Sequence, residues 1–187
     1  MKRIFVIFII VILSILAFLA IQSRNNNEVI APTTDQIQIP QGYKKYSDLG
    51  FTIYHSPNML VRKEGDGIAA FVLIGPSQKG QTEMYDGINI TIFKVETYTQ
   101  DNFKSFVEKE VEKIKNDGMS EITKGITPIQ IGKYRGLKFT VHGFGEHEEV
   151  YLEGNDKKYL HIATLVEDPT NQEFEEMKNK ILETIEF

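Results

Sequence analysis

Residues 136–167 read GLKFTVHGFGEHEEVYLEGNDKKYLHIATLVE, three strand-like runs joined by turns too short to hold a helix. Glycine, asparagine and aspartate mark the two turns, at 143–145 and 154–156. Parallel neighbours need a crossover of about a dozen residues or more, so these runs must pair as antiparallel strands. The stretch therefore predicts an antiparallel meander at the centre of the fold.

Two amphipathic helices are expected on either side of this meander. In residues 101–117 apolar side chains recur at spacings of three and four, with Asp101 as a candidate cap and Gly118 just past the end. Residues 170–187 carry a second such stripe. The start signals of that helix are the capping-box spacing of Thr170 and Glu173 and the preceding Asp168-Pro169.

A further strand is predicted at 125–132, and a turn at Lys133-Tyr134 connects it to the meander. The remaining strands lie nearer the N-terminus. Residues 43–57 read as two short strands around Asp48-Leu49-Gly50. The continuous apolar run IAAFVLIG (68–75) predicts a strand buried on both faces, and residues 88–93 alternate between isoleucine and other residues. Short connections throughout predict an α+β fold with a mainly antiparallel sheet flanked by helices.

Two apolar patterns carry a resemblance to a known family. The opening YSDLGFTIYHSP (46–57) and the closing ILETIEF (181–187), after the strand YLHIATLVED (159–168), resemble the ends of PsbP-like domains of the Mog1/PsbP fold. The resemblance covers about residues 43–187 and implies accessory, assembly or binding modules rather than enzymes. Plant members assist the oxygen-evolving complex of the photosystem, and Mog1 binds a small GTPase. Neither context is present here, and fold alone does not give function.

A membrane anchor is expected at residues 1–22. Ile4–Ile21 is interrupted only by Ser14, and at 1.5 Å per residue it spans about 27 Å, close to the roughly 30 Å of a bilayer core. Lys2 and Arg3 precede the stretch, which predicts a cytoplasmic N-terminus and an extracytoplasmic domain in the cell membrane. A cleaved signal peptide and a buried core helix are the alternatives. Residues 23–42 then read as a flexible linker to the domain at 43–187.

Charge and cysteine content exclude several functions. The chain has 21 basic and 26 acidic residues, of which three basic and two acidic ones lie in residues 1–42. The domain is thus left with 18 basic and 24 acidic residues, a net charge of −6 that disfavours nucleic-acid binding. The absence of cysteine excludes thiol catalysis, disulfides and thiolate metal sites.

The stretch GPSQKGQT (75–82) is one residue away from a phosphate-binding loop. Gln81 stands where that loop needs lysine, and the following residues lead into a strand instead of a helix. We therefore predict a surface loop at 75–87 and no nucleotide site. Its length makes it a candidate partner contact.

The hairpin tip at 142–149, HGFGEHEE, is a candidate zinc or manganese site. It brings together His142, Glu146, His147 and Glu149, of which His147 and Glu149 should share a strand face while His142 lies across the turn. Solvation of these side chains is the simpler explanation. His161 is expected to be a half-buried strand histidine.

No catalytic motif is recognisable. There is no G-x-S-x-G elbow, and Glu146, Glu148 and Glu149 lack an apolar setting that would raise a pKa. His55 stands alone before a turn. The tyrosines could line a recognition surface but are better explained by packing: Tyr43, Tyr46, Tyr54 and Tyr85.

These observations predict a membrane-anchored extracytoplasmic accessory or binding module that docks a partner protein and has no catalytic activity, cofactor or metal. The alternative is a small-molecule or metal-binding domain that uses loop 75–87 or the hairpin tip. A hydrolase with an unrecognised site is the third possibility.

Overall fold

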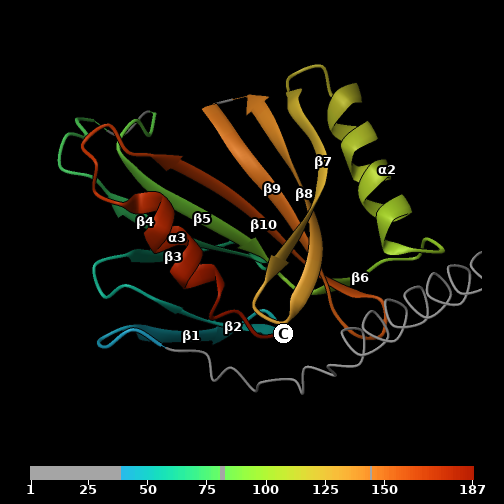
Figure 1. The fold of residues 1–187 in the computed structure, drawn as a ribbon, viewed down its shortest axis with the longest axis horizontal. Helices are drawn as coiled ribbons and strands as arrows, with labels where there is room; N and C mark the ends of the chain where they lie inside the picture. The colour runs from blue at the N-terminus through green and yellow to red at the C-terminus, as the bar shows by residue number, and fades with distance from the viewer. Residues whose placement is uncertain (1–38, 81–82, 144) are drawn as a thin grey trace, which may run out of the picture. The chain divides into compact units, whose positions relative to one another are not determined.

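The computed structural model describes residues 39–80, 83–143 and 145–187 (Figure 1). Within them the chain forms two helices and ten strands. They are β1 (Lys44–Asp48), β2 (Phe51–His55), β3 (Leu60–Glu64), β4 (Ile68–Ile74), β5 (Gly87–Phe93), β6 (Glu96–Thr97), α2 (Phe103–Asn116), β7 (Glu121–Ile131), β8 (Tyr134–Gly143), β9 (Gly145–Glu153), β10 (Lys158–Glu167) and α3 (Phe174–Leu182).

The predicted α+β architecture with an antiparallel sheet is confirmed. Eight strands form one sheet in the order β3-β4-β5-β10-β9-β8-β7, with β6 pairing beside β5 on β10. All of its strand pairs are antiparallel, and the expected meander runs from β7 to β10. The two-stranded sheet β1-β2 is tied to the C-terminal segment by paired backbone hydrogen bonds between Thr52 and Glu186, of 2.8 and 2.9 Å.

Each helix covers a different face of the large sheet. The helix α3 contacts β2, β5 and β10, and Figure 1 shows α2 standing beside β7. The core under α3 is built from alternate residues of β4, β5, β9 and β10, together with β2. The core under α2 is smaller and rich in aromatic residues: Tyr98, Phe103, Phe106, Val107, Val111, Phe139, Val141 and Tyr151.

The helix starts differ from two sequence predictions. The side chain of Asn102, and not that of Asp101, caps α2 by accepting a 2.9 Å hydrogen bond from the Ser105 N–H. Thr170 and Glu173 form no capping box, because Glu173 is left-handed and makes no side-chain cap bond. Asp168 takes that place, accepting from the backbone N–H of Gln172 and Phe174 at 2.6 and 3.1 Å. Of the two start signals predicted for α3, only Asp168-Pro169 is therefore confirmed.

Two further expectations needed adjustment. The hairpin turn between β7 and β8 lies at Gly132-Lys133, one residue before the predicted position. Strand β4 is not buried throughout on both faces, since Val72 is half-buried and Ile74 is 56% exposed. The predicted turn between β1 and β2 is present, and the positive φ of Leu49 and Gly50 (56° and 85°) fits a two-residue hairpin loop.

The expected anchor at 1–22 lies outside the described residues. Within the part of the chain that the structure describes, no helix has the length and apolar character needed to cross a bilayer. Of the expected linker, residues 39–42 are described, and they end in a turn in which the Tyr43 N–H donates to the Pro40 carbonyl at 3.2 Å.

Candidate functional site

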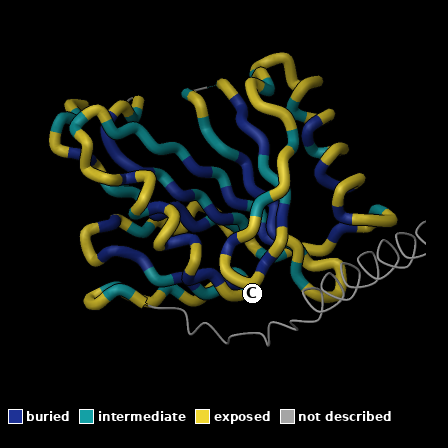
Figure 2. Tube along the Cα trace, viewed as in Figure 1, coloured by how far each residue is buried: buried dark blue, intermediate teal, exposed yellow. Residues whose placement is uncertain are grey.

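One part of the sheet carries side chains that belong to neither core. Ile88, Ile90 and Ile92 of β5 are fully buried beneath α3, so the residues between them point to the opposite face. On that face the α2 core reaches only β7, β8, β9 and the beginning of β10. In Figure 2 the traces of β5 and β10 accordingly alternate between buried and half-buried residues, whereas Ala69, Ala70 and Phe71 of β4 are all buried. We call the surface left on this side the open face: Leu60, Ile68, Val72, Asn89, Thr91, Phe93, Ala163 and Leu165.

The strand register arranges the open face in rows across the strands. The central row pairs Ala70 with Thr91 and Thr91 with Ala163, all small side chains. A second row runs beside it through Leu60, Val72, Asn89 and Leu165. Leu60 is 51% exposed at the end of that row. Two exposed charged residues of β3 border the face, since Arg62 pairs with Ala70 at the end of the central row and Glu64 pairs with Ile68.

A buried carboxylate lies where the open face meets the α2 core. Glu149 of β9 is only 8% exposed and pairs across the strands with Phe139 and Ala163. Its Oε1 lies 3.2 Å from His147 Nε2, and its Oε2 is hydrogen-bonded to His161 Nε2. We call these three side chains the His-Glu-His cluster.

Aromatic stacking holds His161 in place. Its imidazole lies between the rings of Phe93 and Tyr151, with centroid separations of 4.2 and 4.3 Å and interplanar angles of 8° on both sides. Because β5, β10 and β9 are neighbours in the sheet, one side chain from each builds this stack. The arrangement fixes the plane of the imidazole and directs Nε2 to Glu149.

The hydrogen bonds decide the charge of the cluster. Burial raises the pKa of Glu149, but the hydrogen bonds from His147 and His161 outweigh burial and hold that pKa below its ordinary value. The hydrogen bond to Glu149 raises the pKa of His147 against the opposing effect of burial. Glu149 is therefore an ionised acceptor at neutral pH, and both imidazoles donate to it through Nε2.

The candidate metal site at the hairpin tip is divided between the two faces of the sheet. His142 and Glu146 face each other across the hairpin, and Glu146 pairs with Lys124 at 3.2 Å. His147 and Glu149 share the other face, as predicted, and it is His161 that joins them. Each imidazole has its own carboxylate oxygen, and no three His, Asp or Glu side chains in residues 39–80, 83–143 and 145–187 form a group that could hold a metal ion.

Sequence reasoning missed the role of His161 because its partners come from another strand. The signal that could have found it is the alternation of β9 and β10. With the register of a short hairpin, His161 and Glu149 fall on one face. The prediction of a half-buried strand histidine is confirmed.

The loop at 75–87 is organised around a fully buried carboxylate. Asp86 accepts hydrogen bonds from the backbone N–H and the hydroxyl of Ser77, at 2.6 and 2.7 Å, and from the Thr170 hydroxyl at 3.3 Å. Burial raises the pKa of Asp86, but these hydrogen bonds outweigh it and keep the pKa below its ordinary value. A Cβ at Gly75 would overlap the Asp86 carboxylate. No helix begins in the described residues of this loop, so its first glycine serves packing.

A charged network fills the other face of the sheet near α3. Lys178 is 3% exposed and pairs with Glu148 at 3.2 Å and with Glu175. Lys138 contacts the second oxygen of Glu148 at 2.6 Å. Lys178, Glu148 and Glu175 of this network line a hollow of about 430 Å³ between α3 and the ends of β8, β9 and β10.

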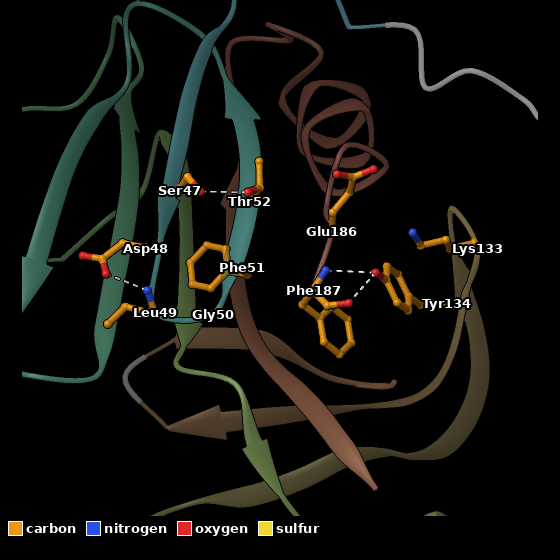
Figure 3. Close-up of a pocket in the computed structure, with 10 residues that line it drawn as sticks. All are labelled: Ser47, Asp48, Leu49, Gly50, Phe51, Thr52, Lys133, Tyr134, Glu186 and Phe187. Carbon is orange, nitrogen blue, oxygen red and sulfur yellow. Dashed lines mark hydrogen bonds between the residues drawn. The ribbon is translucent and has the colours of Figure 1, made fainter. Parts of the chain in front are cut away.

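A larger hollow, of about 600 Å³, lies between the β1-β2 turn and the C-terminal segment (Figure 3). The Tyr134 hydroxyl donates to the Phe187 carbonyl at 2.8 Å and accepts from the Phe187 N–H at 2.9 Å, and the two rings stack at 4.3 Å. In Figure 3 Phe51 and Tyr134 come from opposite sides of this hollow. Tyr134 and Phe187 join β8 to the C-terminal segment through these contacts, so we assign no ligand to this hollow.

The other histidine and the tyrosines singled out from the sequence have mainly packing roles. His55 is buried beside Phe71, and its Nδ1 lies 2.9 Å from the Ser56 carbonyl. Tyr46 packs against Phe51 and Phe71. Tyr43 contacts the same core, Tyr54 is half-buried, and Tyr85 is 42% exposed and supports loop 75–87 through its hydroxyl.

No protein-family model and no curated protein matches the chain. Among solved structures, the chain is similar to a protein from Bacteroides thetaiotaomicron VPI-5482 solved at 1.50 Å, with 14% sequence identity and a TM-score of 0.48. The match covers 78% of this chain and 48% of that protein, so the chain spans about half of its length. A TM-score below 0.5 is too low to assign any residue of the site from that protein.

Proposed function

We propose that the protein is a membrane-anchored extracytoplasmic accessory module that binds a partner protein through the open face and catalyses no reaction. The observation that carries this proposal is a surface of apolar and small side chains on β4, β5 and β10 that neither core covers, bordered by exposed Arg62 and Glu64 of β3. The centres of protein–protein interfaces are depleted of charge.

The chemistry of the open face supports a largely apolar partner surface. Half-buried Val72, Phe93 and Leu165 contribute to neither core, and the row of small side chains between them lets a partner approach the sheet closely. An apolar surface contacting them would remove from water area that folding has left exposed. The apolar stretch Ile4–Ile21 supports placement of such a partner at the membrane.

We also propose that the domain is related to PsbP-like domains of the Mog1/PsbP fold. The order of strands, α2, meander and α3 supports this relationship. In that class accessory and binding roles prevail, which agrees with the proposed function.

Site-specific photo-cross-linking in native membranes tests the proposal. A photoreactive amino acid is placed at Thr91, in the centre of the open face, and, as a matched control, at exposed Lys109 on α2. We expect one dominant cross-linked protein from position 91 and none in common with position 109. The same product from both positions would contradict the proposal.

Substitution of the open face then measures its contribution. Ala163→Arg places a charged side chain in the central row, and Lys109→Ala changes a charge elsewhere. We expect the first to weaken binding of the cross-linked protein at least tenfold and the second to leave it unchanged, with both variants folded by circular dichroism. Equal affinity of the two variants would refute the open face as the contact.

Small-molecule binding is our second candidate function, and the hollow beside Lys178 is the observation that favours it. A buried ammonium among carboxylates and the hydroxyls of Thr140 and Thr164 could orient a polar ligand. Native mass spectrometry of the purified full chain tests this role. A bound metabolite that is lost in Lys178→Met would favour the second candidate over the first.

A further inference from the structure

We propose that the hollow between α3 and the sheet binds a small zwitterion, namely a free α-amino acid with an uncharged side chain. The carboxylate of the ligand accepts hydrogen bonds from Thr140, Thr164 and Lys178, and its ammonium group donates to carboxylates at the rim. This inference rests on the second candidate function, because it names the ligand class of the same hollow. It does not involve the open face, which lies on the opposite side of the sheet.

One row of side chains from four strands runs along the hollow. The register places one residue from each of β7, β8, β9 and β10 in line: Lys124, Thr140, Glu148 and Thr164. All four line the hollow. The row lies on the α3 side of the sheet, since the residues on either side of Thr140 in β8 belong to the core under α2.

Two hydroxyls in this row are buried and unengaged. Thr140 is 4% exposed and Thr164 is 3% exposed. Neither hydroxyl has a hydrogen-bond partner among the described residues, and neither oxygen is sealed off, because the one enclosed side-chain oxygen without a partner in that part of the chain belongs to Tyr46. Buried polar groups in proteins are nearly always hydrogen-bonded. A ligand or water in the hollow must therefore supply the partners of both hydroxyls.

The buried ammonium group of Lys178 adds a third donor. It carries three N–H bonds, of which one is directed to Glu148 at 3.2 Å and one to Glu175. Across residues 39–80, 83–143 and 145–187 the third N–H has no acceptor. Glu148 stands between Thr140 and Thr164 in the row, so the three donors gather around it. Because Lys178 and Lys138 neutralise Glu148, a second carboxylate can accept hydrogen bonds from these donors.

The rim of the hollow offers acceptors instead of donors. Glu175 of α3 and Glu146 of β9 are both exposed, and each uses one oxygen, for Lys178 and for Lys124 respectively. In the described part of the chain their second oxygens are not hydrogen-bonded. Ionised carboxylates accept only, so these two oxygens suit an ammonium group. The hollow thus has a donor pole inside and an acceptor pole at its mouth.

Charge balance favours a zwitterion over a simple ion. On the α3 side of the sheet three carboxylates are matched by three ammonium groups: Glu146, Glu148, Glu175, Lys124, Lys138 and Lys178. His147 and Glu167 also border the hollow, but by strand alternation their side chains belong to the opposite face. A ligand with a net charge would leave one charge uncompensated in a partly buried place, which is costly.

A neutral sugar would keep the same balance, but its hydroxyls form weaker contacts. Hydrogen bonds between ionised groups are roughly twice as strong as those between neutral groups, so a ligand with both charges uses both poles best. The volume of about 430 Å³ lies within the roughly 300–1,000 Å³ of small-molecule sites.

Equilibrium dialysis of radiolabelled L-alanine against the full chain in lipid nanodiscs tests this inference. Propionate and ethylamine serve as competitors, because each is alanine without one of its two charged groups. Glucose represents neutral sugars, and empty nanodiscs are the blank. We expect L-alanine to bind about tenfold or more tightly than any of the three competitors. Equal affinity of alanine and one fragment, or no binding of L-alanine, L-valine or L-glutamine, would overturn the inference.

Substitutions then test the assigned contacts. Thr140→Val and Thr164→Val together remove both hydroxyls and keep the shape of the side chains, so we expect the affinity for L-alanine to fall by about tenfold or more. Thr97→Val, on exposed β6, is the matched control and should leave it unchanged. Glu175→Gln changes the exposed rim without disturbing the interior, and should weaken binding about threefold. Full affinity in the folded double variant or in Glu175→Gln would refute the assigned poles.

Failure of this inference can be told apart from failure of the function on which it rests. If no uncharged amino acid binds, but native mass spectrometry finds another metabolite that is lost in Lys178→Met, only the ligand class is wrong. If that metabolite is missing too, the second candidate function fails as well.

Discussion

The carboxylate of Asp86 lies against the Cα of Gly75, in the space that the Cβ of any other residue at position 75 would occupy. The two residues also share a backbone hydrogen bond, from the Gly75 N–H to the Asp86 carbonyl, of 2.9 Å. The loop that resembles a phosphate-binding loop thus uses its first glycine to admit a buried aspartate.

Gly75→Ala should destabilise the domain by about 1–3 kcal/mol, because the added methyl group displaces the Asp86 carboxylate from its hydrogen bonds with Ser77. Urea unfolding measures the loss. Gly125→Ala is the matched control, since no atom lies within 4 Å of a Cβ at that position. Equal stability of the two variants would show that Asp86 can move without cost.

Glu149→Gln should destabilise the domain most between about pH 4.5 and 6.5. The lowered pKa of Glu149 contributes stability above its ordinary value of 4.5, which is lost as pH falls through the folded-state pKa. The raised pKa of His147 contributes stability that is complete below its ordinary value of 6.5 and is lost as pH rises through the folded-state pKa. Both contributions are complete only between these two values.

We expect a loss of about 1–3 kcal/mol in that window from the buried hydrogen bonds of Glu149, measured by urea unfolding from pH 4 to pH 8. Glu112→Gln, on the exposed side of α2, is the control and should show no maximum. A loss that does not vary with pH would mean that packing, and not charge, accounts for the effect of Glu149.

Lys178→Ala should cost about 2–4 kcal/mol, because it removes a buried aliphatic chain and leaves Glu148 with Lys138 alone. Lys178→Met keeps most of the aliphatic side chain and should lower the free energy of unfolding less than Lys178→Ala. The difference between the two variants therefore measures the contribution of packing. Lys180→Ala is the surface control. Its pair with Glu176 is exposed and should contribute at most about 1 kcal/mol. Thermal unfolding of the three variants ranks them directly.

Zinc or manganese should not raise the melting temperature of the domain. The four side chains of the hairpin tip lie on two faces of the sheet, and the two imidazoles near the open face are both turned to Glu149. Differential scanning fluorimetry with increasing metal concentration checks this expectation. A saturable rise that disappears in His142→Ala would instead establish a metal site at the tip.

The local patterns of the sequence were sufficient for the class of fold. Alternating isoleucines at 88–92, the stripe of α2 and the short turns of the meander each depend on neighbours in the chain, and each prediction is confirmed. The pairing of β5 with β10 joins residues about 70 to 80 positions apart, and no local pattern encodes it. The same limit applies to the site. His147 and Glu149 could be placed on one face, whereas the contact with His161 and the open face required the order of the strands.

The pairing of β5 with β10 also determines when the domain can fold. Ile92 lies opposite Ile162, so β3, β4 and β5 emerge from the ribosome without the strand that completes their sheet. Contacts between distant residues form slowly, and until β10 is present an apolar strand edge is available for wrong pairing. During synthesis the N-terminal half of the domain therefore has an unpaired apolar edge until β10 has been made. Truncation before β10 should yield insoluble protein and not a smaller folded domain.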